Sequence, residues 1–185
     1  MPDPRIERTR VHVLTIARQM LVERSGDPLT FSRLAERAQV SRRTLYTHWG
    51  TIERVIAEAV AEPDPTTAID VTGLSKREIL REILNGTRDR LTDPVTHVAL
   101  TSLVSQASTD DNAAEALRHM GTARKTEHEQ LLGTSISHEQ YSKIVGPLYY
   151  SQLILGEQLS DGFLDDQVEL ALVVLDLSDD ERAAS

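Results

Sequence analysis

The fold is decided between residues 29 and 50, where the chain reads Leu29-Thr-Phe-Ser-Arg-Leu-Ala-Glu-Arg-Ala-Gln-Val-Ser-Arg-Arg-Thr-Leu-Tyr-Thr-His-Trp-Gly50. Thr30 and Ser41 each stand before a short run with helical spacing, where an N-cap residue is expected. Two short helices are predicted, over residues 31–38 and 42–48, with only the tight turn Gln39-Val40 between them. Such a pair is typical of a helix-turn-helix, in which the second helix lays side chains into the major groove of DNA.

The apolar residues of this stretch have the spacing to pack the two helices together: Leu34, Ala35, Ala38, Val40 and Leu45. Mostly hydrophilic residues are left on the outer side of the second helix. Arginine can bind guanine through two hydrogen bonds, while hydroxyl and imidazole groups suit phosphate. Free N–H groups at helix starts are further phosphate ligands. The predicted DNA-contacting residues are Thr30, Arg42, Arg43, Thr44, Tyr46, Thr47, His48 and Thr51.

Helices are predicted on both sides of this pair. The first has an apolar face at three- and four-residue steps and ends at the turn signal Ser25-Gly26-Asp27-Pro28. A fourth helix, over residues 52–62, follows Thr51 as its cap and ends at Pro63-Asp64-Pro65. The apolar face of the first helix comprises Ile6, Val13, Leu14, Ala17, Met20 and Leu21.

The rest of the chain also has helical periodicity and no recurring strand pattern. Asp93-Pro94 restarts a helix, Asp111 is expected to cap the next, and Gly146-Pro147 predicts a kink inside a later one. The helices expected here are residues 75–92, 94–108, 112–132, 137–156 and 161–177. The sequence therefore predicts an all-α protein of about nine helices, with a three-helix helix-turn-helix domain over residues 1–62 and a helical domain over residues 63–185.

Charge divides along the same boundary. Residues 1–62 contain ten arginines, no lysine and eight carboxylates, a net charge of +2, whereas residues 63–185 carry −11, and together these give the −9 of the whole chain. Attraction to phosphate depends on the local field rather than on the total charge. The acidic total therefore does not exclude binding to DNA.

Several classes of protein are disfavoured. Without cysteine there is no disulfide framework and no Cys-ligated zinc site. No apolar run is long enough to cross a bilayer, and we expect a cytoplasmic protein. His128-Glu129 and His138-Glu139 begin like zinc-protease motifs, but each lacks the second histidine. With no nucleophile and base at a recognisable spacing, we predict that the chain is not an enzyme and needs no cofactor or metal.

The run from Leu29 to Gly50 resembles the signature of the TetR (tetracycline repressor) family. The family pattern has Thr opening the second helix, Ala-Glu-Arg-Ala before the turn, Val-Ser at the turn, Thr-Leu-Tyr in the third helix, and then His, an aromatic residue and Gly. The match covers about residues 5 to 60 without a gap. The resemblance implies that Thr30, Thr44, Tyr46 and His48 hold phosphates and that Arg42, Arg43 and Thr47 read bases, with Arg5 and Arg8 near the backbone or minor groove.

The sequence departs from the family pattern at three positions. Gln39 replaces the usual turn glycine, which puts a side chain where a positive φ is expected. Trp49 stands in place of the commoner Phe and is expected in the core, where Tyr46 could also pack instead of facing DNA. Ile52 replaces a lysine at the start of the fourth helix, so that a phosphate contact is lost or moved to Arg54.

The resemblance also implies a homodimer and a small-molecule effector bound in the second domain. The last two helices would pair with those of a second copy, although the same residues also suit the core of one chain. The predicted dimer contacts are Leu148, Leu155, Leu164, Val168, Leu172 and Leu175. The predicted effector contacts are Leu100, Leu103, Val104, His119, Met120, Tyr149 and Gln152.

These features together indicate a DNA-binding transcriptional regulator whose partners are double-stranded DNA, a second copy and an unknown effector. A repressor released from a pseudo-palindromic operator is the family's common mode. The alternative is a protein of the same fold that binds a ligand or another protein and has lost DNA recognition. Gln39 and Ile52 favour that alternative.

Overall fold

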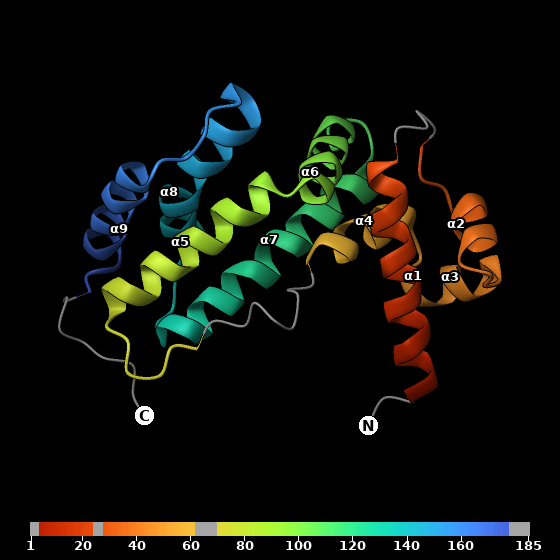
Figure 1. Cartoon of the computed structure of the whole chain (residues 1–185), viewed down its shortest axis with the longest axis horizontal. Coiled ribbons are helices and arrows are strands. Elements are labelled where there is room, and N and C mark those ends of the chain that lie inside the picture. Colours follow the sequence, from red (N-terminus) through yellow and green to blue (C-terminus); the bar gives the residue numbers. More distant parts are fainter. Residues whose placement is uncertain (1–3, 24–27, 62–69, 178–185) are drawn as a thin grey trace. The chain divides into compact units, whose positions relative to one another are not determined.

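The computed structural model describes residues 4–23, 28–61 and 70–177, with side chains from residue 6 onward (Figure 1). Throughout these ranges there are nine α-helices, one π-helical segment and no β-strand. In chain order they are α1 (Pro4–Val22), α2 (Phe31–Arg37), α3 (Arg42–Trp49), α4 (Ile52–Ala61), α5 (Lys76–Thr92), α6 (Pro94–Gln106), α7 (Asp111–Leu132), α8 (His138–Tyr149), η2 (Tyr150–Leu155) and α9 (Asp161–Leu175). The predicted all-α class is confirmed.

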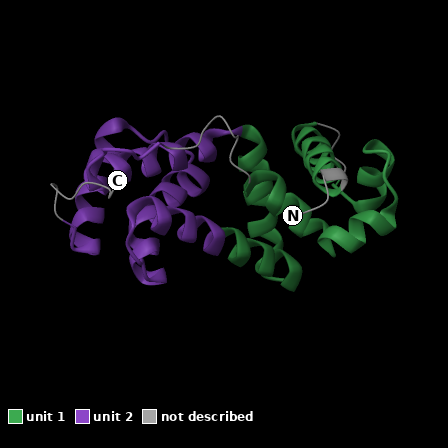
Figure 2. Ribbon diagram, turned by 90° about the horizontal axis from the view of Figure 1, so that it is seen from below, with its two compact units in different colours: residues 1–63, 94–120 green, residues 64–93, 121–185 purple. Residues whose placement is uncertain are grey.

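The chain forms two compact units (Figure 2). Unit 1 comprises residues 1–63 and 94–120, and unit 2 comprises residues 64–93 and 121–185. Unit 1 therefore contains α1 to α4, α6 and the first part of α7, and unit 2 contains α5, the rest of α7, α8, η2 and α9. The functional boundary predicted after residue 62 is a different division, and it stays a prediction.

The core of unit 1 forms where α1 packs against α2, α4 and α6. Val13, Leu34, Leu45 and Val55 are completely buried in it. The apolar face predicted for the first helix is largely present, but Ile6 is 46% exposed. Its assignment to that face was wrong, because the buried face of α1 begins only at Val13.

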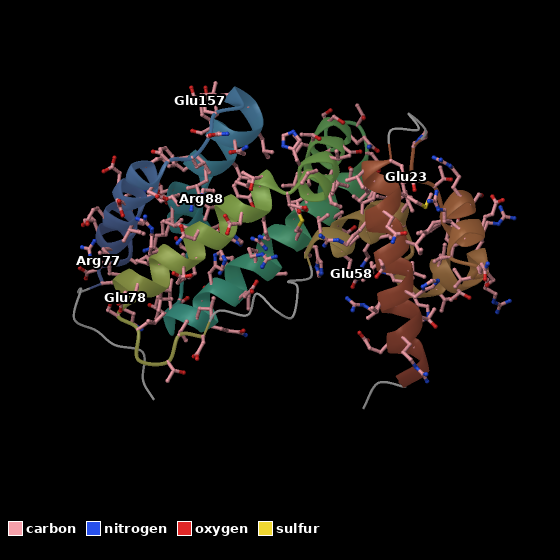
Figure 3. The ribbon with its side chains drawn as sticks, viewed as in Figure 1. Glu23, Glu58, Arg77, Glu78, Arg88 and Glu157 are labelled. Atoms are coloured by element: carbon pink, nitrogen blue, oxygen red, sulfur yellow. The ribbon has the colours of Figure 1, made fainter. Side chains whose placement is uncertain are left out.

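In unit 2, α5, α8 and α9 pack on one another. Ion pairs join α5 to α9 along their length, and their reversed order in the sequence shows that the two helices are antiparallel. Exposed pairs of this kind contribute little individually and more as a network. Arg88 and Arg77 are labelled in Figure 3. The pairs are Arg77–Glu169, Arg81–Asp165 and Arg88–Asp161.

Two predictions on helix ends need correction. Asp111 does not cap α7 but is its first residue, because the Asp110 carboxylate accepts a hydrogen bond from the Asn112 N–H at 2.8 Å. Residues 137–156 do not form one helix. Pro147 lies within α8, and from Tyr150 the chain continues as the π-helical η2, which ends at Leu155 and is capped by Gly156 with a φ of 68°. A proline without an N–H group interrupts the hydrogen-bond ladder, so an irregularity at this place is expected.

Candidate nucleic-acid interface

Three hydroxyl side chains define the helix starts around the predicted interface. Thr30 accepts from the Arg33 N–H at 3.4 Å, Ser41 from the Thr44 N–H at 3.0 Å, and Thr51 from the Arg54 N–H at 3.2 Å. Each bond satisfies one of the N–H groups that a helix start leaves without a partner. The predicted caps of α2, α3 and α4 are therefore confirmed.

The turn between α2 and α3 requires a left-handed residue. Gln39 has a φ of 53°, and the Val40 N–H reaches back to the Ala35 carbonyl at 3.0 Å. A residue with a Cβ is strained in this conformation, whereas glycine is not. The expectation that Gln39 occupies a positive-φ position is confirmed.

We predict that Gln39→Gly raises the free energy of unfolding by about 1 kcal/mol, because it relieves the left-handed strain. Urea denaturation followed by circular dichroism measures this change. Glu36→Gly is the matched control: Glu36 is exposed in helical α2. There glycine should lower the free energy of unfolding by about 1 kcal/mol. A loss of stability in both variants would contradict the strain argument.

Helix α3 is held by only two buried side chains, Leu45 and Trp49. Leu45 has no exposed surface and Trp49 is 3% exposed, and both belong to the core of unit 1. The prediction that Trp49 lies in the core is confirmed.

The opposite face of α3 is open. Arg42, Arg43, Thr47 and His48 are exposed, and Thr44 is half-buried. Within the described part of the chain, neither Arg42 nor Arg43 makes an ion pair. The two guanidinium groups therefore lie on the surface with their donors available to a ligand.

Tyr46 lies on the same open face and is 59% exposed. Its ring packs edge-on against Phe31 of α2, with 4.5 Å between ring centroids. The alternative that Tyr46 is a core residue does not hold. The ring contact fixes the side chain while the residue stays accessible.

The threonine hydroxyls of α3 are already engaged within the helix. Thr47 Oγ1 donates to the Arg43 carbonyl at 2.8 Å, and Thr44 Oγ1 lies 2.8 Å from Ser41 Oγ. To donate to a phosphate or a base, the Thr47 hydroxyl would have to break its hydrogen bond with the Arg43 carbonyl. By contrast, the cap hydroxyls of Thr30 and Thr51 accept hydrogen bonds from backbone N–H groups. Their own O–H groups can therefore still donate to a phosphate oxygen.

A polar network that the sequence does not reveal lies beneath α3. Trp49 Nε1 donates to Glu58 Oε2, and Arg10 Nη2 donates to Glu58 Oε1 at 2.9 Å. Glu58, labelled in Figure 3, therefore joins α4 to both α1 and α3. Arg18 adds a second link between α1 and α4, with Nη1 2.9 Å from the Ala59 carbonyl. The nine-residue separation of Trp49 and Glu58 fits no motif, so the sequence pattern carries no signal for this contact.

The N-terminal arginines lie on α1. Arg8 is engaged in an interaction within the protein. The side chain of Arg5 lies outside the described residues. The prediction that these arginines reach DNA stays a prediction.

The predicted effector contacts do not form one buried set. Five of them, Leu100, Leu103, Val104, His119 and Met120, belong to unit 1, whereas Tyr149 and Gln152 belong to unit 2. Val104 is 54% exposed, and His119 is exposed. Leu103, by contrast, is completely buried in the core of unit 1, and the role of these residues in effector binding stays a prediction.

Unit 2 contains a buried polar cluster that was not predicted from the sequence. Tyr141 Oη lies 3.2 Å from His128 Nδ1, and Arg124 pairs with Glu127 at 2.6 Å. Burial, with a smaller contribution from Arg124, lowers the pKa of His128 to about 4. Burial raises the pKa values of Tyr141 and Tyr149 above their ordinary range. The available signal was helical spacing, which puts residues 124 and 128 on the same stripe as Leu117 and Met120 of α7.

We predict that this histidine makes folding pH-dependent. The unfolded chain binds a proton at His128 below its ordinary pKa of 6.5, whereas the folded chain stays neutral down to about pH 4. The contribution of His128 to the free energy of unfolding is therefore fully present above pH 6.5. It falls as the pH drops, by about 2 kcal/mol between pH 7 and pH 5. Urea unfolding of His128→Gln should show a correspondingly smaller pH effect. His119→Gln, at an exposed position of α7, should keep the full effect, and an equal loss in both variants would contradict the prediction.

The predicted dimer contacts divide into two groups. Leu148, Leu164, Val168 and Leu172 are at most 7% exposed and fill the core of the chain's own unit 2. Assigning them to a dimer surface was wrong, because they have almost no free surface to offer. Leu155 is 49% exposed and Leu175 is half-buried. The large apolar side chains exposed in the described part of unit 2 are Tyr150, Ile154, Leu155, Leu170 and Val173.

Membrane spans and metal clusters are both absent from the described ranges. None of the helices there is long and apolar enough to cross a membrane. No group of three or more metal-ligating side chains comes together in them.

A helix-turn-helix whose second helix is held by its inner face and presents two arginines outward defines a DNA-binding regulatory protein. Residues 13–59 match the family model of the tetR family of bacterial regulatory proteins. This part of the chain, which includes α2, α3 and most of α4, is therefore similar to the DNA-binding part of that family.

Similarity to individual proteins extends beyond the matched domain. The chain is 27% identical over 177 residues to YdeS, an uncharacterized HTH-type transcriptional regulator of Bacillus subtilis (strain 168), with 89% of this chain and 88% of YdeS aligned. Its fold is similar to the crystal structure of a TetR transcriptional regulator from Rhodococcus sp. RHA1, with a TM-score of 0.62 and 17% identity over 91% of this chain and 97% of that chain.

Proposed function

We propose that the chain is a sequence-specific transcriptional regulator that binds a pseudo-palindromic operator as a homodimer and is released by a small-molecule effector. The observation that carries the proposal is the open face of α3, where Arg42 and Arg43 make no ion pair within the described part of the chain. The name of YdeS, a transcriptional regulator, supports the same function.

Base reading is assigned to Arg42, Arg43 and Thr47, and phosphate binding to Thr30, Thr44, Tyr46, His48 and Thr51. A single short helix contacts few base pairs, so two copies are needed for adequate specificity. Two copies of α3 would enter successive major grooves about 34–36 Å apart on straight DNA.

The dimer is assigned to unit 2. Ile154 is 67% exposed on η2 and Val173 is 79% exposed on α9. Large apolar side chains left this open are favourable contacts for a second copy. A self-complementary surface of this kind gives the two-fold symmetry that a pseudo-palindrome requires.

The effector contacts are proposed around Tyr149 and Gln152 of unit 2. The Gln152 Oε1 atom is buried and has no hydrogen-bond partner among the described residues. A ligand donor there would remove the penalty of an unpaired acceptor. Arg124 acts electrostatically on Tyr149 and is itself paired with Glu127, so a polar ligand in this region would meet a cation–carboxylate pair and a hydroxyl. Coupling of ~1–3 kcal/mol between effector and operator is enough for a switch.

Selection of genomic fragments by the purified protein tests this function. Sequencing of the bound fragments should return one enriched pseudo-palindromic motif, and a duplex of that motif should bind more tightly than a scrambled one. The absence of any enriched sequence at low and at physiological salt would favour the alternative of a ligand- or protein-binding module without DNA recognition. The protein would act in the cytoplasm, where the bacterial chromosome lies.

A further inference from the structure

The inner face of α3 has one directional contact. Leu45 and Trp49 are its only buried residues. The leucine packs without a directional preference, so by itself it allows the helix to rotate about its axis. The indole N–H of Trp49 can only donate, and a buried donor needs a partner.

That partner is the carboxylate of Glu58, which is half-buried on α4. One of its oxygens accepts from Trp49, while the other accepts from Arg10 of α1 at 2.9 Å. Hydrogen bonds to an ionised carboxylate are stronger than neutral ones. The Arg10 guanidinium holds the carboxylate from its other side.

We propose that Glu58 is a positioning residue for DNA recognition, which fixes the orientation of α3 through the Trp49 indole. The inference rests on the proposed DNA-binding function and adds to it a residue remote from the DNA-contacting face. Arg43 and Thr47 lie on the same short helix as Trp49, so a rotation about Trp49 moves both relative to base edges. Displacement of α4 would also be passed to α3 through this bond.

A double-mutant cycle between Glu58 and Trp49 tests the proposal. Glu58→Ala, Trp49→Phe and the double variant are compared with the parent in binding to the selected operator. Glu58→Ala alone leaves a buried N–H without an acceptor and should weaken operator binding about tenfold. In the Trp49→Phe background the donor is gone, so the same change should weaken binding less than about twofold. Equal losses in the two backgrounds would overturn the proposal.

Two further variants separate orientation from charge. Glu58→Gln keeps an acceptor for the indole and should stay within about threefold of the parent, whereas a loss as large as that of Glu58→Ala would overturn the proposal. Glu53→Ala removes the same charge from α4 at a half-buried position without a hydrogen bond to Trp49, and should leave the operator preference unchanged. The affinity for scrambled DNA should change little in every variant, because phosphate contacts do not depend on base alignment.

Fluorescence gives a readout without DNA, since Trp49 is the single tryptophan of the chain. In Glu58→Ala, water should replace the carboxylate at the indole N–H, and the emission maximum should move to longer wavelength. An unchanged spectrum would overturn the proposal. A parent protein that enriches no DNA would instead refute the proposed function, so the two failures are distinguishable.

Discussion

Val173→Asp on α9 should convert the proposed dimer into monomers and weaken operator binding by about 100-fold or more. Val173 is 79% exposed in the single chain, so the substitution leaves the protomer's own core intact. In a dimer the new carboxylate would be buried against apolar surface, which is costly for an unpaired charge. Two linked DNA-binding domains bind an operator about 10²–10⁴ times more tightly than one domain does, and a monomer loses this increase in affinity.

Light scattering after size exclusion measures the oligomeric state, and band-shift titration measures the affinity. Ile154→Asp on η2 should act in the same way, because its side chain is 67% exposed. Thr126→Asp, which adds the same charge at an exposed position of α7, serves as the control and should stay dimeric. A Val173→Asp protein that remains dimeric with parental affinity would contradict the assignment of the dimer surface to α9.

The sequence predicted the helix-turn-helix almost residue by residue because its information is local. Thr30, Ser41 and Thr51 bond to N–H groups three residues ahead, and such contacts depend only on nearby positions. The left-handed turn at Gln39 was expected from the resemblance, because the family pattern has glycine at this position, and Gln39 has a φ of 53°.

The exposed apolar face to which the dimer is assigned was not predictable in this way. Leu172 is 7% exposed while its neighbour Val173 is 79% exposed, and both are aliphatic. In a continuous apolar run, hydrophobic residues lie on two faces of the helix. Their spacing therefore does not show which face packs in the protomer's own core. The Trp49–Glu58 bond shows a second limit, because it depends on how α3 packs on α4 rather than on any spacing in the chain.

Arg43→Ala should reduce the affinity for the selected operator by about 10- to 100-fold, because an arginine bound to guanine supplies ~1–3 kcal/mol of discrimination. Arg43 is exposed and unpaired among the described residues, so its removal costs the fold little. Repeating the fragment selection with this variant should yield a motif that has lost its preference at one position in each half-site. Thr47→Ala should relax the preference less, since its hydroxyl donates to the Arg43 carbonyl in the free protein.

Tyr46→Phe provides the contrast that makes this result interpretable. It keeps the ring contact with Phe31 and removes only the hydroxyl, so it should weaken binding to all duplexes alike if Tyr46 holds a phosphate. Arg118→Ala, at an exposed position of α7, removes one positive charge outside α3 and controls for net charge. If Arg43→Ala lowered affinity without changing the selected motif, Arg43 would be a phosphate ligand. Sequence reading would then belong to Arg42, and because the two side chains leave α3 about 100° apart, the helix would lie in the groove with a different rotation.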